Sequence, residues 1–121
     1  MSWIVPLIVA ALLIVLFLMK QMGQVSAKDA RALLGNGAMV VDVRTAGEFV
    51  SGHLPMALNL PLNEIEGDIA HFVRNKDQAM LLHCHSGVRS GIAIKKLKAM
   101  GYTNLHNLGS YERAATIVSG R

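Results

Sequence analysis

The chain has 121 residues and a formal net charge of +4, and 52% of its residues are hydrophobic. The charge is modest, no nucleic-acid motif is present, and no aromatic residues alternate with the basic cluster Lys95, Lys96 and Lys98, so we expect no nucleic-acid partner. The single cysteine, Cys84, excludes an intramolecular disulfide and agrees with a reducing compartment.

The N-terminal stretch from Trp3 to Met19 contains no charged residue. As a helix it would extend about 26 Å, which is near the short end of what crosses a bilayer core. It also lacks the polar face of a soluble helix. We therefore predict a transmembrane anchor over residues 1–20, with Lys20 reaching one membrane interface and Trp3 at the other. A linker over residues 21–25 and one domain over residues 26–121 would follow.

The basic residues around this segment predict its orientation. No Lys or Arg precedes the apolar run, whereas Lys20, Lys28 and Arg31 follow it closely. The positive-inside rule then predicts a single-pass protein of the inner (cytoplasmic) membrane with a cytoplasmic domain. The alternative is a signal peptide cleaved near Val25–Ala27, which would leave the domain in the periplasm. The length of the run and its missing basic flank favour the anchor.

Strand and helix patterns alternate through the rest of the chain. Helix starts are indicated by Ser26 with Asp29 and by Thr45 with Glu48, both of which resemble capping boxes. We expect further helices at residues 64–73, 90–100 and 111–118, and strands at residues 38–43, 57–60, 79–83 and 105–108. This alternation predicts an α/β domain with a small, mostly parallel sheet flanked by helices. Ligands bind such sheets beyond the carboxyl ends of the strands.

Cys84 follows the third predicted strand at such an end and precedes a short polar loop that leads into a helix. Loop N–H groups and the positive end of a helix dipole favour a thiolate there. Arg89 adds a fixed positive charge, so the segment indicates an anion-binding loop with a sulfur nucleophile at its base. Adjacent strand positions face opposite sides of a sheet, which argues against a metal shared by His83, Cys84 and His85. We expect no metal and no cofactor.

Several ordered motifs resemble those of the rhodanese domain family. They are Asp42–Arg44 with Glu48–Phe49 and Gly52–Pro61, then Cys84–Ser90, then Gly101–Leu105 with Asn107–Leu108. The resemblance spans residues 26–115 and implies a rhodanese-like fold and a thiosulfate sulfurtransferase. Such an enzyme takes sulfane sulfur from thiosulfate or a persulfide donor as a cysteine persulfide and passes it to a thiol or cyanide acceptor.

The resemblance also implies the roles of the loop residues. Cys84 would be the catalytic nucleophile, the loop N–H groups would hold the terminal sulfur of its persulfide, and Arg89 would bind the donor's oxygens through paired N–H bonds. The predicted substrate-binding residues are His85, Ser86, Gly87, Val88 and Arg89. Asp42 and Arg44 are interpreted as scaffold charges, and His83 as a structural residue.

Two other functions are compatible with the same residues. The loop has four residues between Cys84 and Arg89, as in sulfurtransferases, whereas cysteine phosphatases of similar fold have one more and form a wider ring of donors. A phosphatase or arsenate reductase is therefore a minor alternative. The other alternative is a non-catalytic sulfur-carrier or redox-sensing module at the membrane.

Overall fold

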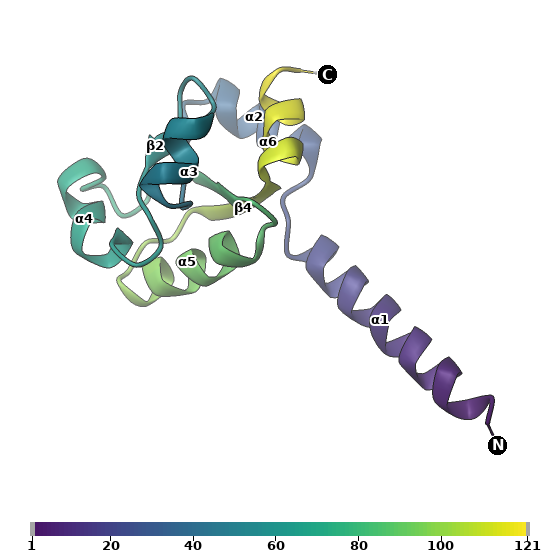
Figure 1. The fold of residues 1–121 in the computed structure, drawn as a ribbon. Coiled ribbons are helices and arrows are strands. Elements are labelled where there is room, and N and C mark those ends of the chain that lie inside the picture. Colours follow the sequence, from purple (N-terminus) through teal and green to yellow (C-terminus); the bar gives the residue numbers. More distant parts are fainter. Residues whose placement is uncertain (1, 121) are drawn as a thin grey trace.

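A computed structural model describes residues 2–120, except for the side chains of residues 19–22. Helices and strands alternate along the chain as predicted (Figure 1). In chain order they are α1 (Ile4–Met22), α2 (Ala27–Gly35), β1 (Met39–Asp42), α3 (Ala46–Ser51), β2 (Leu58–Asn59), α4 (Ile65–Phe72), β3 (Met80–Cys84), α5 (Val88–Ala99), β4 (Leu105–Ser110) and α6 (Tyr111–Val118).

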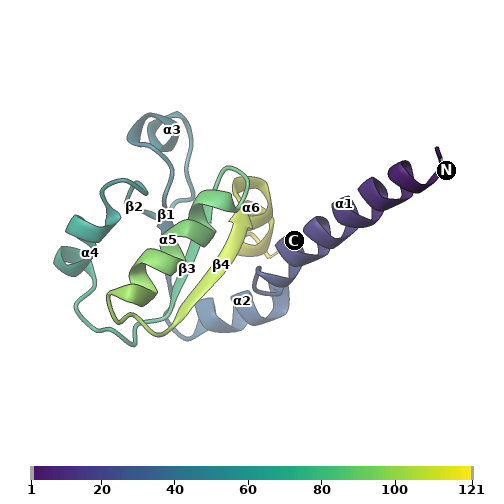
Figure 2. The same cartoon turned by 90° about the horizontal axis from the view of Figure 1, so that it is seen from below.

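The four strands form one parallel sheet in the order β2-β1-β3-β4. Helices α4 and α5 cover one face, and α2 and α6 cover the other (Figures 1 and 2). All five residues of β3 are buried, as expected of a strand packed on both faces. The prediction of an α/β domain with a small parallel sheet flanked by helices is confirmed.

Local capping explains where two of the helices begin. The Ser26 hydroxyl accepts the Asp29 N–H at 3.1 Å. At α3, Thr45 Oγ1 accepts the Glu48 N–H at 3.2 Å, and Glu48 Oε1 accepts the Thr45 N–H at 3.1 Å, which completes a capping box. Both predicted helix starts are confirmed, and the second one already ties Glu48 to a defined position.

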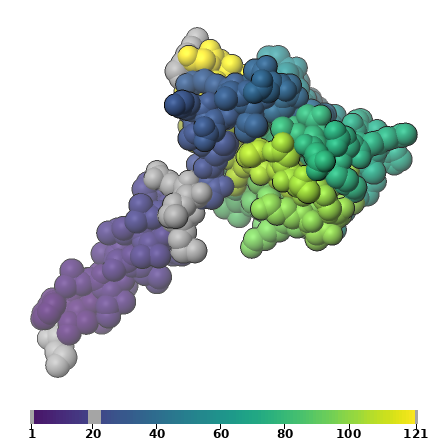
Figure 3. Space-filling model, turned by 180° about the vertical axis from the view of Figure 1, so that it is seen from behind, coloured from purple at the N-terminus to yellow at the C-terminus, as the bar shows by residue number. Residues whose placement is uncertain are grey.

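The N-terminal helix α1 projects away from the sheet and the other helices (Figures 1 and 3). Its large apolar side chains between Trp3 and Leu18 are exposed. In the part of the chain that the structure describes, no helix is both long enough and apolar enough to cross a membrane. The predicted transmembrane helix is therefore not confirmed. The predicted interfacial position of Lys20 concerns a side chain outside the described residues.

One irregularity of the sheet lies next to the predicted site. Leu82 of β3 pairs with Asn107 of β4, but the next residue, His83, pairs with Gly109. Leu108 is thus an extra residue in β4 and forms a β-bulge. Because of this bulge, β4 continues to Ser110, two residues beyond the predicted strand.

Candidate active site

Cys84 is the last residue of β3, at the carboxyl edge of the parallel sheet. Its side chain is fully buried, in the apolar cluster that also includes residues of α4 and α5. The sulfur accepts a hydrogen bond from the Gly87 N–H at 2.9 Å and lies 3.7 Å from the Ser90 hydroxyl oxygen. The sequence placed the thiol correctly at a strand end, under a loop that leads into a helix.

Gly87 gives this loop its shape. It is the N-cap of α5 and has a φ of +94°, in the left-handed region that favours glycine. A Cβ at this position would lie 3.2 Å from Gln24 Nε2 and 3.3 Å from the Cα of Gly109. Backbone conformation and space therefore both require glycine where the chain turns to direct an N–H group at the sulfur.

The surroundings of Cys84 have opposing effects on the pKa of its thiol. Burial raises the pKa of the Cys84 thiol, but hydrogen bonds from Ser90, Ser86 and Gly87 together lower it by more. The pKa therefore lies below its ordinary value. The loop N–H groups stand at the start of α5, where the partial positive charge of the helix also favours an anion. The arrangement stabilises a nucleophilic thiolate.

Arg89 lies in the first turn of α5 and pairs with Glu48 of α3. Nη1 lies 2.6 Å from Oε1 and Nη2 lies 3.0 Å from Oε2, with about a third of each side chain exposed. The hydrogen bond from Arg89 is the main reason that the pKa of Glu48 is lowered to about 2. The guanidinium is thus held by a carboxylate, and its binding of donor oxygens stays a prediction.

The other predicted loop residues differ in their exposure and in their contacts. The side chains of His85, Ser86 and Val88 are exposed. Ser86 forms an isolated antiparallel bridge with Ser110, which connects the loop to the end of β4. Of the predicted substrate-binding set, Gly87 donates its N–H to the sulfur at 2.9 Å, and the Ser86 backbone also lowers the thiol pKa.

Sequence reasoning missed three functional residues. The loop motif ends at Ser90, which the predicted site does not include, although its hydroxyl faces Cys84. Asn107 binds Ser90 and Gly87, and Glu48 binds Arg89. The position of Ser90, directly after Arg89 and one helical turn from Gly87, is the local signal that could have identified it.

A buried ion pair supports the neighbouring strand end. Asp42 is fully buried, and its Oδ2 lies 2.7 Å from Nη2 of Arg44, which also donates to the Gly52 carbonyl at 2.7 Å. The Arg44 guanidinium stacks 4.5 Å above the centre of the Tyr111 ring. The interpretation of Asp42 and Arg44 as scaffold charges agrees with these contacts, which fix the turn after α3.

His83 is fully buried beside this ion pair, with Nε2 3.8 Å from Asp42 Oδ2. Among the described residues, neither ring nitrogen has a hydrogen-bond partner. Burial lowers the pKa of His83, which keeps the ring neutral near pH 7. Within residues 2–120, no group of three or more His, Cys, Asp or Glu side chains is arranged to hold a metal ion.

The site geometry agrees with comparison to known proteins. The family model of the rhodanese-like domain matches residues 26–114. The chain belongs to the rhodanese-like domain family. The match covers the sheet, the Cys84 loop and the first half of α6, and it leaves α1 outside the rhodanese-like domain.

Several relatives of this rhodanese-like domain are named sulfurtransferases. Thiosulfate sulfurtransferase PspE of Escherichia coli is 35% identical over 62% of this chain and 72% of its own length. Thiosulfate sulfurtransferase GlpE of Pseudomonas entomophila is 31% identical over 78% of this chain and 85% of its own. The human thiosulfate:glutathione sulfurtransferase is 31% identical, covering 72% and 88%.

Solved structures show the same rhodanese-like fold. A rhodanese with anions from E. coli superposes with a TM-score of 0.61 at 32% identity, covering 64% of this chain and 91% of that one. The human single domain sulfurtransferase TSTD1 superposes with a TM-score of 0.67 at 29% identity, covering 77% and 95%. These matches support sulfurtransferase activity at the level of the family.

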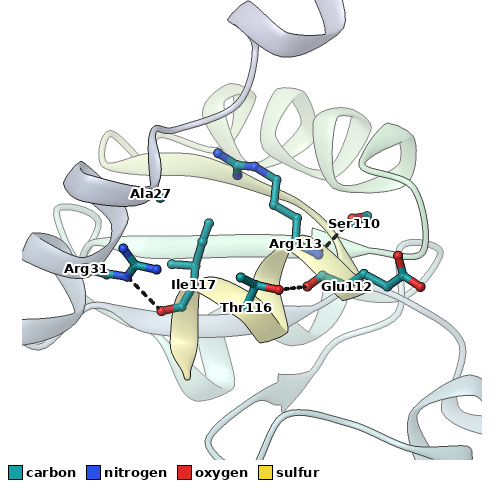
Figure 4. A pocket seen from close by; sticks show the side chains of 7 residues that line it. All are labelled: Ala27, Arg31, Ser110, Glu112, Arg113, Thr116 and Ile117. Carbon is teal, nitrogen blue, oxygen red and sulfur yellow. Dashed lines mark hydrogen bonds between the residues drawn. The ribbon is translucent and has the colours of Figure 1, made fainter. Parts of the chain in front are cut away.

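A surface hollow of the rhodanese-like domain lies away from this chemistry. It has a volume of about 500 Å³, and Figure 4 shows the side chains that line it. They belong to Ala27, Arg31, Ser110, Glu112, Arg113, Thr116 and Ile117. No residue of the Cys84 loop is among them, and Arg113 donates to the Leu108 carbonyl at 2.8 Å. The active-site assignment therefore rests on the Cys84 contacts rather than on the size of a hollow.

Proposed function

We propose that the chain is a rhodanese-type sulfurtransferase, which moves sulfane sulfur from thiosulfate or a persulfide donor to a thiol or cyanide acceptor. The observation that carries the proposal is the environment of Cys84, whose sulfur faces the Gly87 N–H and the Ser90 hydroxyl at the start of α5. The names of its relatives support a thiosulfate-type donor. The human relative's name supports a thiol acceptor.

The reaction has two displacement steps at sulfur. The Cys84 thiolate attacks the outer sulfur of thiosulfate, an S–S bond forms, and the S–S bond of the donor breaks, so that sulfite leaves with the electron pair. A nucleophilic acceptor then attacks the outer sulfur of the Cys84 persulfide, and Cys84 leaves as a thiolate. The same N–H groups stabilise the anion before the first step and after the second.

Because Cys84 is buried, this reaction requires that the donor gain access to its sulfur. Its side chain is fully buried, whereas His85, Ser86 and Val88 of the loop are exposed. We expect a donor to reach the sulfur through a rearrangement of these exposed loop residues, while Asn107 holds Gly87 and Ser90 to β4.

Sulfur loading tests the proposal directly. The full chain, purified in detergent, is treated with thiosulfate and measured by intact mass spectrometry, and we expect one added sulfur atom on Cys84. Cyanide should then remove that sulfur as thiocyanate, over many cycles. Cys84→Ser should abolish both results, whereas Thr116→Ala, in the hollow between α2 and α6, should leave them unchanged. Thiocyanate formation by Cys84→Ser at the wild-type rate would refute the proposal.

The full burial of Cys84 also favours a second candidate, a sulfur-carrier or redox-sensing module. Such a module holds one sulfur and does not turn over with a small acceptor. The same assay separates the two functions. Loading of one sulfur followed by no thiocyanate production identifies the carrier, and repeated cycles identify the enzyme.

We also propose that α1 attaches the domain to the cytoplasmic side of the inner membrane. The exposed apolar side chains between Trp3 and Leu18 and the basic residues Lys28 and Arg31 that follow them support this location. We expect the full chain to stay with membranes after an alkaline carbonate wash and to lose its domain to protease only in inverted vesicles. A shortened intact mass, from cleavage near Val25–Ala27, would identify the periplasmic alternative.

A further inference from the structure

The side chain of Asn107, in β4, contacts the Cys84 loop through both ends of its amide. Nδ2 donates to the Gly87 carbonyl at 3.1 Å. Oδ1 accepts the Ser90 hydroxyl at 2.8 Å and the Gly109 N–H at 2.9 Å. The Gly109 N–H can only donate and the Gly87 carbonyl can only accept, so only one orientation of the amide satisfies both.

The β-bulge in β4 explains how Asn107 comes to face the loop. The extra residue, Leu108, separates Asn107 from Gly109, and Gly109 has a φ of +94°. A bulge changes the direction of the side chains beside it. Here the carbonyl of Asn107 also accepts the Val25 N–H at 2.9 Å, so that the segment before α2 holds this part of β4 in place.

Asn107 is connected to the Cys84 sulfur through the two residues that it binds. Both loop residues that it binds, Ser90 and Gly87, face Cys84 Sγ with a donor. The Ser90 hydroxyl has a single hydrogen and three acceptors in range: Asn107 Oδ1, the Gly87 carbonyl and Cys84 Sγ. When negative charge develops on the sulfur, the hydrogen can rotate to it. Asn107 Oδ1 then still has the Gly109 N–H as a donor.

We infer that Asn107 is a positioning residue for Cys84, which acts through Ser90 and Gly87 by holding their donor groups against the sulfur. It touches neither the sulfur nor, in the proposed reaction, the substrate. The inference rests on the proposed function only where it concerns turnover. The effect of Asn107 on the pKa of the Cys84 thiol does not depend on the identity of the substrate.

The test measures the pKa of the Cys84 thiol in the full chain, from the pH dependence of its alkylation by iodoacetamide. We expect Asn107→Ala to raise this pKa by about one unit, because a hydrogen bond to a charged group contributes about that much, and to slow alkylation about tenfold at pH values well below the pKa. Asn107→Asp keeps the size of the side chain but loses the donor to Gly87 and adds a negative charge, so it should raise the pKa at least as far.

The matched control is Asn104→Ala, at the residue that directly precedes β4. The Asn104 side chain is also half-buried and pairs with His106 Nε2 at 2.6 Å, away from the loop. Its loss should leave the thiol pKa unchanged even where it lowers the melting temperature. A purely structural Asn107 would behave in the same way, and that result would overturn the inference.

A double-mutant cycle tests the route through Ser90. In a Ser90→Ala background, Asn107→Ala should raise the thiol pKa by clearly less than it does in the wild type. If Asn107→Ala raises the thiol pKa equally in the two backgrounds, Asn107 does not act through Ser90. Failure of thiosulfate loading with the alkylation results intact would count against the proposed function and leave this inference standing.

Discussion

Arg89, in the first turn of α5, and Glu48, in α3, form an ion pair through two hydrogen bonds, although they are 41 residues apart in the chain. Each guanidinium Nη atom binds one carboxylate oxygen, at 2.6 and 3.0 Å. Arg89 presents to this carboxylate the same paired N–H groups that an anionic donor would need. We therefore expect Glu48 to compete with a donor for Arg89.

The first prediction concerns donor affinity. Glu48→Gln removes the negative charge but keeps the capping box with Thr45, because glutamine serves equally well at that position. We expect the KM for thiosulfate to fall, by at most about fivefold, since an exposed ion pair contributes about 1 kcal/mol or less. Steady-state thiocyanate formation measures it. Glu112→Gln on α6 is the control, and an unchanged or higher KM in Glu48→Gln would show that Arg89 does not bind the donor.

The second prediction concerns acid stability. The pKa of Glu48 is lowered from its ordinary 4.5 to about 2, chiefly by the hydrogen bond from Arg89. A lowered pKa means that the unfolded chain binds more protons, so the stabilisation is complete above about pH 4.5 and is lost as the pH falls toward 2. Urea unfolding should show a gap between wild type and Glu48→Gln that narrows over this range. A gap that does not change with pH would contradict the assignment.

The third prediction concerns the buried imidazole of His83. Both of its ring nitrogens lack hydrogen-bond partners, and such groups cost about 1–3 kcal/mol each when buried. His83→Leu removes the polar atoms at similar volume, so we expect the free energy of unfolding to rise by about 1–2 kcal/mol. His106→Leu is the matched control, because it breaks the bond to Asn104 and should destabilise. A loss of stability in His83→Leu would contradict the prediction.

The fourth prediction concerns the backbone of the loop. Gly87→Ala places a Cβ on a residue with φ +94° and close to Gly109, which should cost about 1–3 kcal/mol and displace the N–H from the sulfur. Sulfur loading of Cys84 should slow accordingly. Gly67→Ala, within α4, adds a Cβ that meets no described atom within 4 Å and should keep the wild-type fold and loading rate. Equal loading by both variants would contradict the role of Gly87.

Much of the fold could be predicted because its signals are local. The capping residues Ser26 and Thr45 and the buried run that ends at Cys84 act on neighbouring residues. Hydrophobic periodicity then predicts the alternation of strands and helices and hence the parallel sheet. The nucleophile followed from the same reasoning, because ligands of such sheets lie at the strand ends.

The partners of the site residues could not be predicted in this way. Glu48 reaches Arg89 only once the fold brings α3 to the start of α5, and Asn107 reaches Ser90 only because a bulge displaces β4 by one residue. Such contacts depend on strand register and on the packing of distant segments, which no local pattern encodes. The sequence by itself determined where the cysteine and its loop lie, at the end of β3 and before α5, and the tertiary structure decided which residues hold them in place.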